Sequence, residues 1–141
     1  MAEQLFRKLV HDAGLSHVHV ESAGVSPALA MTLPEEAQQA LKDEGVEPHP
    51  HRPKGLERKV LAAIDLILTM ELRHKNFVLS QFPETKGKVY LLQEYAGGIS
   101  NFSDVPDPIG GSVTQYRMTL AQIKAALLKI LEKITAGKIN S

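Results

Sequence analysis

Residues 65–70 read Asp-Leu-Ile-Leu-Thr-Met, and this stretch decides the fold class. Its nearly continuous aliphatic side chains are typical of a strand that is covered on both faces in a parallel sheet. The pattern then predicts a helix over 72–82, which ends before Pro83, and a second buried strand over 89–92. Strand, helix and strand in this order indicate an α/β domain with parallel strands.

Upstream of this unit the sequence predicts a helix and a further strand. Apolar residues recur at helical spacing over 2–13, and Gly14 follows as a helix terminator. Residues 17–22 alternate polar and branched apolar side chains, which predicts a short strand.

A second helix is predicted to begin at Pro34, because proline is tolerated in a first turn and the two glutamates that follow suit the positive end of the helix dipole. Gly45 closes this helix. Residues 47–55 hold three prolines and cannot be regular, and a short helix is expected over 56–63.

Downstream of the second buried strand the sequence becomes irregular and then strongly helical. Residues 93–111 carry four Gly and two Pro, and a segment of this length suggests a function beyond connection. Ser112 and Gln115 fit an S-x-x-Q capping box. Apolar residues then keep one helix face to about residue 135.

The order of the elements indicates a doubly wound parallel α/β sheet in a single domain over 1–141. A length of 141 residues suits one domain, and 43% hydrophobic residues supply a core. A doubly wound domain normally opens on a strand, whereas this chain opens on a helix. Element order alone leaves two interpretations open: a helix that happens to be N-terminal, and a strand with its loop missing upstream.

Composition excludes several classes of function. Sixteen Lys and Arg balance 16 Asp and Glu, so no basic surplus indicates nucleic acid or an anionic membrane as a partner. The longest apolar stretch is far shorter than the ~20 residues that span a bilayer, and no secretion signal is visible, so the cytoplasm is expected. The 141 residues contain no Cys, which excludes disulfides, iron–sulfur ligation and a thiol nucleophile within them.

The chain carries, in this order, the segments MAEQLFRKLV, ESAGVS, DLILTMELRHK, KVYLLQEYAGG and DVPDPIGGSVTQYR. In this order and at these spacings they resemble the low-molecular-weight protein tyrosine phosphatase family, and most closely its bacterial members, including those that act on phosphoarginine. The resemblance implies a three-layer doubly wound fold, phosphotyrosine protein phosphatase I-like, whose first strand is interior to a parallel sheet. It also implies that this strand and the C-x5-R phosphate loop lie upstream of Met1, so the chain is expected to lack its first strand.

In that family a cysteine thiolate attacks phosphorus to form a cysteinyl-phosphate, while backbone N–H groups and an arginine hold the phosphate oxygens. The resemblance assigns the general acid to Asp107, between Pro106 and Pro108, and makes Asp104 a less favoured candidate. Asp-Pro-x-Gly is also an ordinary turn sequence, so the assignment depends on its position between a buried strand and the last helix.

Two further residues take roles from the resemblance. Ser22 matches a serine whose hydroxyl supports the phosphate loop, against the alternative of a strand-end serine bonded to local backbone. Ile109 stands where tyrosine-specific members place an aromatic residue, and it is expected to form an apolar wall of the substrate pocket. Without aromatic stacking, which adds about 0.5–1.5 kcal/mol, phosphotyrosine is disfavoured, and phosphoarginine stays open as the substrate.

No cofactor and no metal is expected. His17 with His19, and His49 with His51, are conceivable metal pairs, but neither pair has a third ligand at suitable spacing. A solvated strand face and a polar loop are the preferred interpretations, and the family that the chain resembles needs no metal.

The predicted function is a protein phosphatase that acts on a phosphorylated protein or a small phosphomonoester. Because the nucleophile and the phosphate-binding arginine are not found in these residues, the 141-residue chain is expected to be inactive. The alternative is a catalytically dead, phosphatase-like binding module that uses the Asp107 loop for recognition. Loss of an interior strand would leave unpaired strand edges, so self-association is a further expectation.

Overall fold

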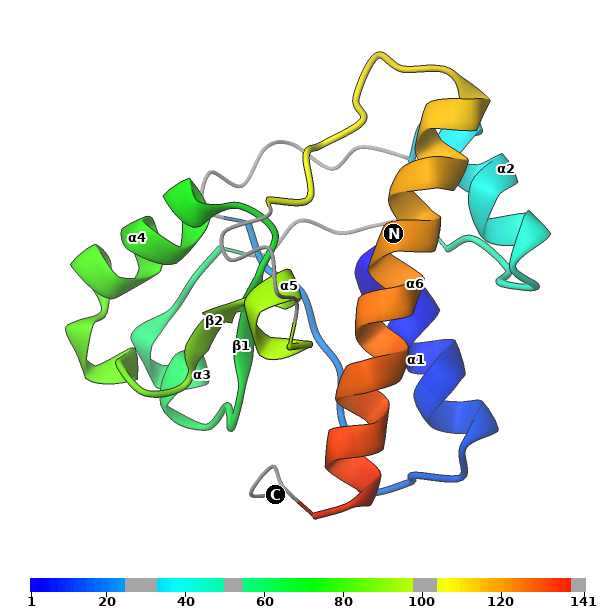
Figure 1. Ribbon diagram of the computed structural model, residues 1–141. Coiled ribbons are helices and arrows are strands. Elements are labelled where there is room, and N and C mark those ends of the chain that lie inside the picture. The colour runs from blue at the N-terminus through cyan, green and yellow to red at the C-terminus, as the bar shows by residue number, and fades with distance from the viewer. Residues whose placement is uncertain (25–32, 50–54, 98–103, 138–141) are drawn as a thin grey trace.

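The computed structural model describes residues 1–24, 33–49, 55–97 and 104–137. Helices and two short strands alternate along the chain (Figure 1). The elements are α1 (Ala2–Asp12), α2 (Glu35–Asp43), α3 (Arg58–Ala62), β1 (Ile67–Thr69), α4 (Leu72–Gln81), the 3-10 helix η1 (Pro83–Thr85), β2 (Val89–Leu91), α5 (Leu92–Tyr95) and α6 (Val113–Thr135).

The sheet in the described residues consists of β1 and β2, which run parallel. Their register pairs Ile67 with Val89 and Thr69 with Leu91. Helix α4 is the crossover between the strands and packs on one side of them, while α5 contacts both strands from the side of α6 and α1 (Figure 1). The prediction of an α/β fold with a parallel sheet is confirmed.

The main hydrophobic core lies where α1, α2 and α6 meet, because each of these helices carries one apolar stripe. The stripe of α6 is the predicted one, and its fully buried residues are Tyr116, Leu120, Ile123, Ala126, Leu127 and Ile130. The predicted capping box is present as well: Gln115 N–H donates to Ser112 Oγ at 3.2 Å, and Ser112 N–H donates to Gln115 Oε1 at 2.9 Å. Helix α6 is therefore the frame on which the other two helices pack.

The predicted strand over 17–22 is wrong. Those residues form no strand, and the neighbouring contact is a single parallel bridge between Gly24 and Gly55. The Val20 carbonyl accepts hydrogen bonds from Arg7 Nε and Nη2, at 2.9 and 2.7 Å, instead of from a neighbouring strand. Alternating side chains make an extended segment, and a strand requires a partner that completes the hydrogen-bond ladder.

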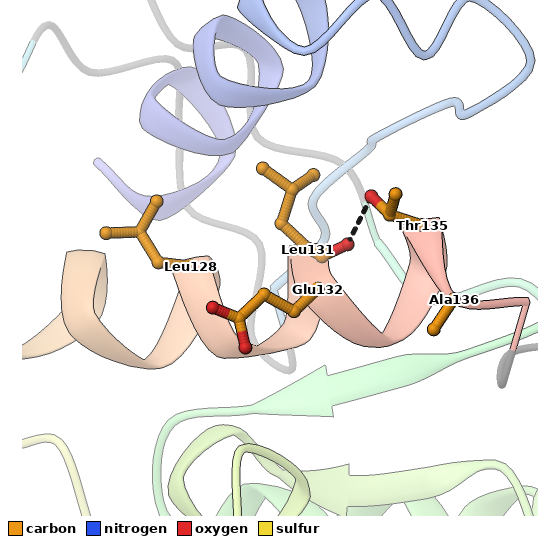
Figure 2. Close-up of a pocket in the computed structure, with 5 residues that line it drawn as sticks. All are labelled: Leu128, Leu131, Glu132, Thr135 and Ala136. Carbon is orange, nitrogen blue, oxygen red and sulfur yellow. Dashed lines mark hydrogen bonds between the residues drawn. The ribbon is translucent and has the colours of Figure 1, made fainter.

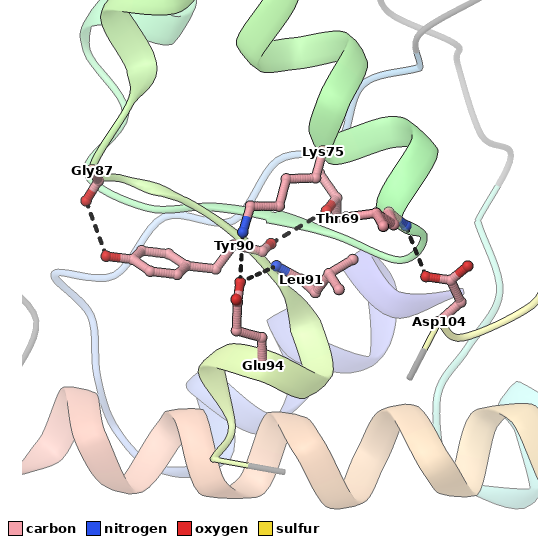
Figure 3. A network of polar contacts seen from close by, with 8 residues as sticks. Thr69, Lys75, Gly87, Tyr90, Leu91, Glu94 and Asp104 are labelled. Carbon is pink, nitrogen blue, oxygen red and sulfur yellow. Dashed lines mark hydrogen bonds and ion pairs between the residues drawn. The ribbon is translucent and has the colours of Figure 1, made fainter. Parts of the chain in front are cut away.

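The predicted irregular segment is also wrong at its start, because residues 92–95 form α5. Glu94 Oε1 accepts the N–H of Leu91 at 3.2 Å and pairs with Lys75 Nζ at 2.9 Å (Figure 3). These contacts hold the chain in a turn of helix as soon as β2 ends. Residues 98–103 of the same predicted segment lie outside the described residues.

None of the helices in the described part of the chain has the length and the apolar character needed to cross a membrane.

Candidate active site

The loop that we call the acid loop, residues 104–111, is attached to the carboxyl end of β1. Its buried residue Val105 donates its N–H to the carbonyl of Met70 at 2.8 Å. Asp104 Oδ1 accepts the N–H of Leu72, the first residue of α4, at 2.7 Å (Figure 3). Ligand sites of parallel sheets lie beyond the carboxyl ends of the strands, so the acid loop stands where such a site is expected.

Asp107 itself is exposed on this loop. Its Oδ1 accepts the N–H of Ile109 at 3.1 Å, which closes a local turn and fixes the carboxyl between two prolines. Ile109 presents its side chain to solvent with 68% of its surface exposed. The loop therefore offers one carboxyl and one aliphatic side chain next to each other in an accessible position.

The start of α1 lies within electrostatic range of Asp107. Burial lowers the pKa of the Met1 amino group, and the carboxylates of Glu3 and Asp107 act against that shift. The Ser22 hydroxyl donates to the Glu3 carboxylate, which also pairs with Arg7 at 2.7 Å. Of the predicted site residues, Ser22 is thus bonded to the first turn of α1, and Asp107 lies within electrostatic range of the same helix end.

A further charged pair that sequence reasoning missed joins Glu71, in the turn between β1 and α4, to Arg73 in the first turn of α4. Arg73 Nε pairs with Glu71 Oε2 at 2.6 Å. The Arg73 hydrogen bond is the main reason why the pKa of Glu71 is lowered, and the backbone N–H of Asp107 acts in the same direction. The pKa of Arg73 is raised by Glu71 first and then by Asp107 and Asp104.

Tyr116 is the other neighbour of Asp107 that was missed, because its position on the apolar stripe of α6 marked it only as a core residue. Burial raises the pKa of its phenol, and the carboxylates of Asp107 and Glu36 add to that effect. The ring packs in the core while its hydroxyl lies within electrostatic range of the acid loop.

A match over nearly the whole chain decides the family. The family model described as low molecular weight phosphotyrosine protein phosphatase matches residues 1–139. The chain belongs to this phosphatase family.

Individual phosphatases show the same relationship. The chain is similar to a protein-arginine-phosphatase of Bacillus subtilis, at 32% identity over 134 residues, which covers 95% of this chain and 87% of the relative. It is similar to the low-molecular-weight protein-tyrosine-phosphatase PtpB of Staphylococcus haemolyticus, at 31% identity, covering 87% of this chain and 81% of the relative. Among solved structures, the low-molecular-weight protein tyrosine phosphatase of T. tengcongensis gives a TM-score of 0.84 at 31% identity, covering 94% and 88% of the two chains.

Three of the four histidines that were considered as metal pairs lie in the described residues. His17 and His19 are both exposed, and the backbone of His49 is held by the side-chain amide of Gln4, at 3.0 and 3.1 Å. His51 lies outside the described residues. Within the described ranges no group of three or more His, Cys, Asp or Glu is placed to hold a metal ion.

A hollow of about 470 Å³ lies along the last turns of α6, lined by Leu128, Leu131, Glu132, Thr135 and Ala136 (Figure 2). It is remote from the acid loop, because the 15 residues from Val113 to Leu128 span about 22 Å of helix. Among the residues that line the hollow, Glu132 is the one with an ionisable side chain. The Thr135 hydroxyl donates to the carbonyl of Leu131 at 2.9 Å. The hollow therefore lacks the paired polar groups that phosphoryl chemistry needs.

Proposed function

We propose that this chain carries the proton-donor side of a protein phosphatase site, with Asp107 as the general acid. The observation that supports the proposal is the placement of the Asp107 carboxyl, exposed on a loop that is bonded to the carboxyl end of β1 and to the start of α4. A general acid must reach the leaving group in this way. The 141 residues contain no Cys, so on this proposal the nucleophile comes from sequence outside them.

In the proposed first step a cysteine thiolate forms a bond to phosphorus, and the bond from phosphorus to the leaving atom breaks. Asp107 gives its proton to that leaving atom, which is the phenolic oxygen of phosphotyrosine or the guanidinium nitrogen of phosphoarginine. A water oxygen then forms a bond to phosphorus while the phosphorus–sulfur bond breaks, which releases inorganic phosphate and the cysteine thiolate, and the Asp107 carboxylate takes the proton from water.

Ser22 and Ile109 are assigned supporting roles in the same proposal. The Ser22 hydroxyl, which is anchored on Glu3 at the start of α1, supports the loop that holds phosphate. Ile109 forms an aliphatic wall beside the acid, with no ring on which a phosphotyrosine could stack. This wall favours phosphoarginine over phosphotyrosine, and rates on the two phosphopeptides measured side by side test that preference.

The purified 141-residue chain is expected to show no phosphatase turnover, because attack on phosphorus needs the missing thiolate. The assay compares it with Asp107→Ala at equal concentration, on a phosphotyrosine and a phosphoarginine peptide. Activity above that control would contradict the proposal.

A second assay tests whether the chain gains phosphatase activity when the missing half of the site is supplied. In it the chain is preceded by a strand and a C-x5-R-S-P loop of the family type, and we call this protein the completed chain. We expect it to hydrolyse a phosphopeptide, whereas the same protein with Ser in place of the loop Cys should not.

We also propose that the 141-residue chain self-associates. In the described residues β1 pairs with β2 alone, and a two-stranded sheet leaves two edges that can template pairing with another chain. Sedimentation velocity is expected to show a mass that rises with protein concentration. A monomer at every concentration would contradict this second proposal.

A further inference from the structure

Arg7 of α1 contacts both the segment that follows the helix and the first turn of the helix itself. Its Nε and Nη2 donate to the carbonyl of Val20, at 2.9 and 2.7 Å. Its Nη2 also pairs with Glu3 Oε2, one helical turn earlier, at 2.7 Å. Because Nη2 carries two N–H groups, one can serve the Val20 carbonyl while the other serves Glu3.

The Glu3 carboxylate uses its two oxygens for two different partners. Oε2 pairs with Arg7, and Oε1 accepts the hydroxyl proton of Ser22. The Glu3 side chain is only 19% exposed, whereas that of Arg7 is 57% exposed. An exposed ion pair contributes little by itself. What distinguishes this pair is that each member also holds the segment that carries Ser22, Arg7 at the Val20 carbonyl and Glu3 at the hydroxyl.

The bond to Glu3 also fixes what the Ser22 hydroxyl can offer to a third group. A serine hydroxyl has one proton and two lone pairs. Because the Ser22 proton is donated to Glu3, only the lone pairs of Oγ remain. Toward a phosphate loop Ser22 can therefore act as the acceptor of an N–H, and it cannot act as a donor while Glu3 stays in place.

We propose that Arg7 is a positioning residue for Ser22. It fixes the Val20 backbone and orients the Glu3 carboxylate, so that the Ser22 hydroxyl meets the phosphate loop as a hydrogen-bond acceptor. The inference rests on the proposed role of Ser22 and deepens it. It gives α1 a part in phosphate binding, because a loop whose support is displaced no longer holds its donors in the productive geometry.

The side-chain rotamer of Ser22 tests this inference in the 141-residue chain, where no turnover is needed. Couplings between the α and β protons of Ser22 report how its χ1 angle is distributed among the staggered rotamers. With its hydroxyl held by Glu3, Ser22 should occupy one rotamer in the unmodified chain. In Arg7→Ala the carboxylate of Glu3 loses the partner that orients it, so the couplings should move to averaged values. Arg7→Lys keeps the charge but not the planar fork of N–H groups, and should give intermediate couplings.

Arg58→Ala is the matched control. Arg58 likewise bonds a carboxylate, that of Glu84, and a backbone carbonyl, that of Gln81 at 3.0 Å. Its side chain is 63% exposed, close to the 57% of Arg7. Because Arg58 lies on α3 and its partners lie in α4 and η1, its loss should leave the Ser22 couplings unchanged.

Binding of inorganic phosphate to the completed chain tests the functional side of the inference. The inhibition constant of phosphate against a phosphopeptide measures how well the phosphate loop holds the anion. Arg7→Ala should raise this constant about three- to tenfold, the range that corresponds to one hydrogen bond. If Arg7 acts through Ser22, a variant with both Arg7→Ala and Ser22→Ala should bind phosphate as Ser22→Ala alone does. A merely structural role would instead make the two losses add.

Ser22 couplings that are the same in Arg7→Ala and in the unmodified chain would overturn the inference. Additive losses of phosphate affinity, or equal losses in Arg7→Ala and Arg58→Ala, would overturn it as well. If Ser22→Ala binds phosphate as tightly as the unmodified completed chain, the proposed role of Ser22 fails, while the couplings in the 141-residue chain still decide whether Arg7 positions the hydroxyl. The two failures are therefore distinguishable.

Discussion

Asp107→Asn in the completed chain is expected to lower kcat about 10²–10⁴-fold, the usual contribution of a positioned general acid, with little change in KM. The amide cannot donate a proton of carboxylic acidity to the leaving atom. It still offers an oxygen to the N–H of Ile109, so the turn is preserved. Initial rates on a phosphopeptide measure both constants.

Asp104→Asn is the matched control for this prediction. Asp104 is also an exposed aspartate of the acid loop, but its Oδ1 is occupied by the N–H of Leu72 at 2.7 Å. The amide oxygen keeps that bond, so kcat is expected to stay close to the unmodified value. Equal losses in the two variants would show that the loop tolerates no change of charge and would remove the case for Asp107 as the acid.

Ile130→Ala is expected to destabilise the chain by about 2–5 kcal/mol, the range for emptying a fully buried aliphatic site. Ile130 has 0% of its surface exposed and lies on the stripe of α6 that α1 and α2 cover. The free energy of unfolding in urea, monitored by circular dichroism, measures the loss.

Met118→Ala on the same helix provides the comparison. Its side chain is 67% exposed, so truncation should change the free energy of unfolding by no more than about 0.5 kcal/mol. If the two variants lost equal stability, the core would not lie between α1, α2 and α6 as described.

The long helices could be predicted from the sequence because each carries its own periodic signal. Helix α6 repeats an apolar stripe over 23 residues and begins with a capping box. Helix α1 ends at Asp12 and is followed by Gly14, where φ is +71°. These signals are local. The strand predicted over 17–22 fails for the opposite reason, because a strand depends on a neighbour that no alternation within the segment can supply.

The candidate site could likewise be predicted from the sequence only in part. Asp107, Ser22 and Ile109 were found through the resemblance of short motifs to a family, and their roles remain proposals. Glu71 and Arg73 were missed because the acid loop, which the neighbouring residues Met70 and Leu72 contact, lies more than 30 positions away in the chain. One signal was available: both residues lie within four positions of the end of β1, and ligand sites of parallel sheets form beyond the carboxyl ends of the strands.

The most direct test of the central claim compares leaving groups. In the completed chain, kcat/KM of Asp107→Asn relative to the unmodified protein is measured on phenyl phosphate and on p-nitrophenyl phosphate, because kcat/KM excludes the later hydrolysis of the cysteinyl-phosphate, which is common to both substrates. Phenol has a pKa near that of tyrosine, about 10, and its oxygen needs a proton in order to leave, whereas nitrophenolate leaves readily without one. If Asp107 donates the proton, the loss is much larger on phenyl phosphate, and equal losses on the two substrates would contradict the role of Asp107 as proton donor.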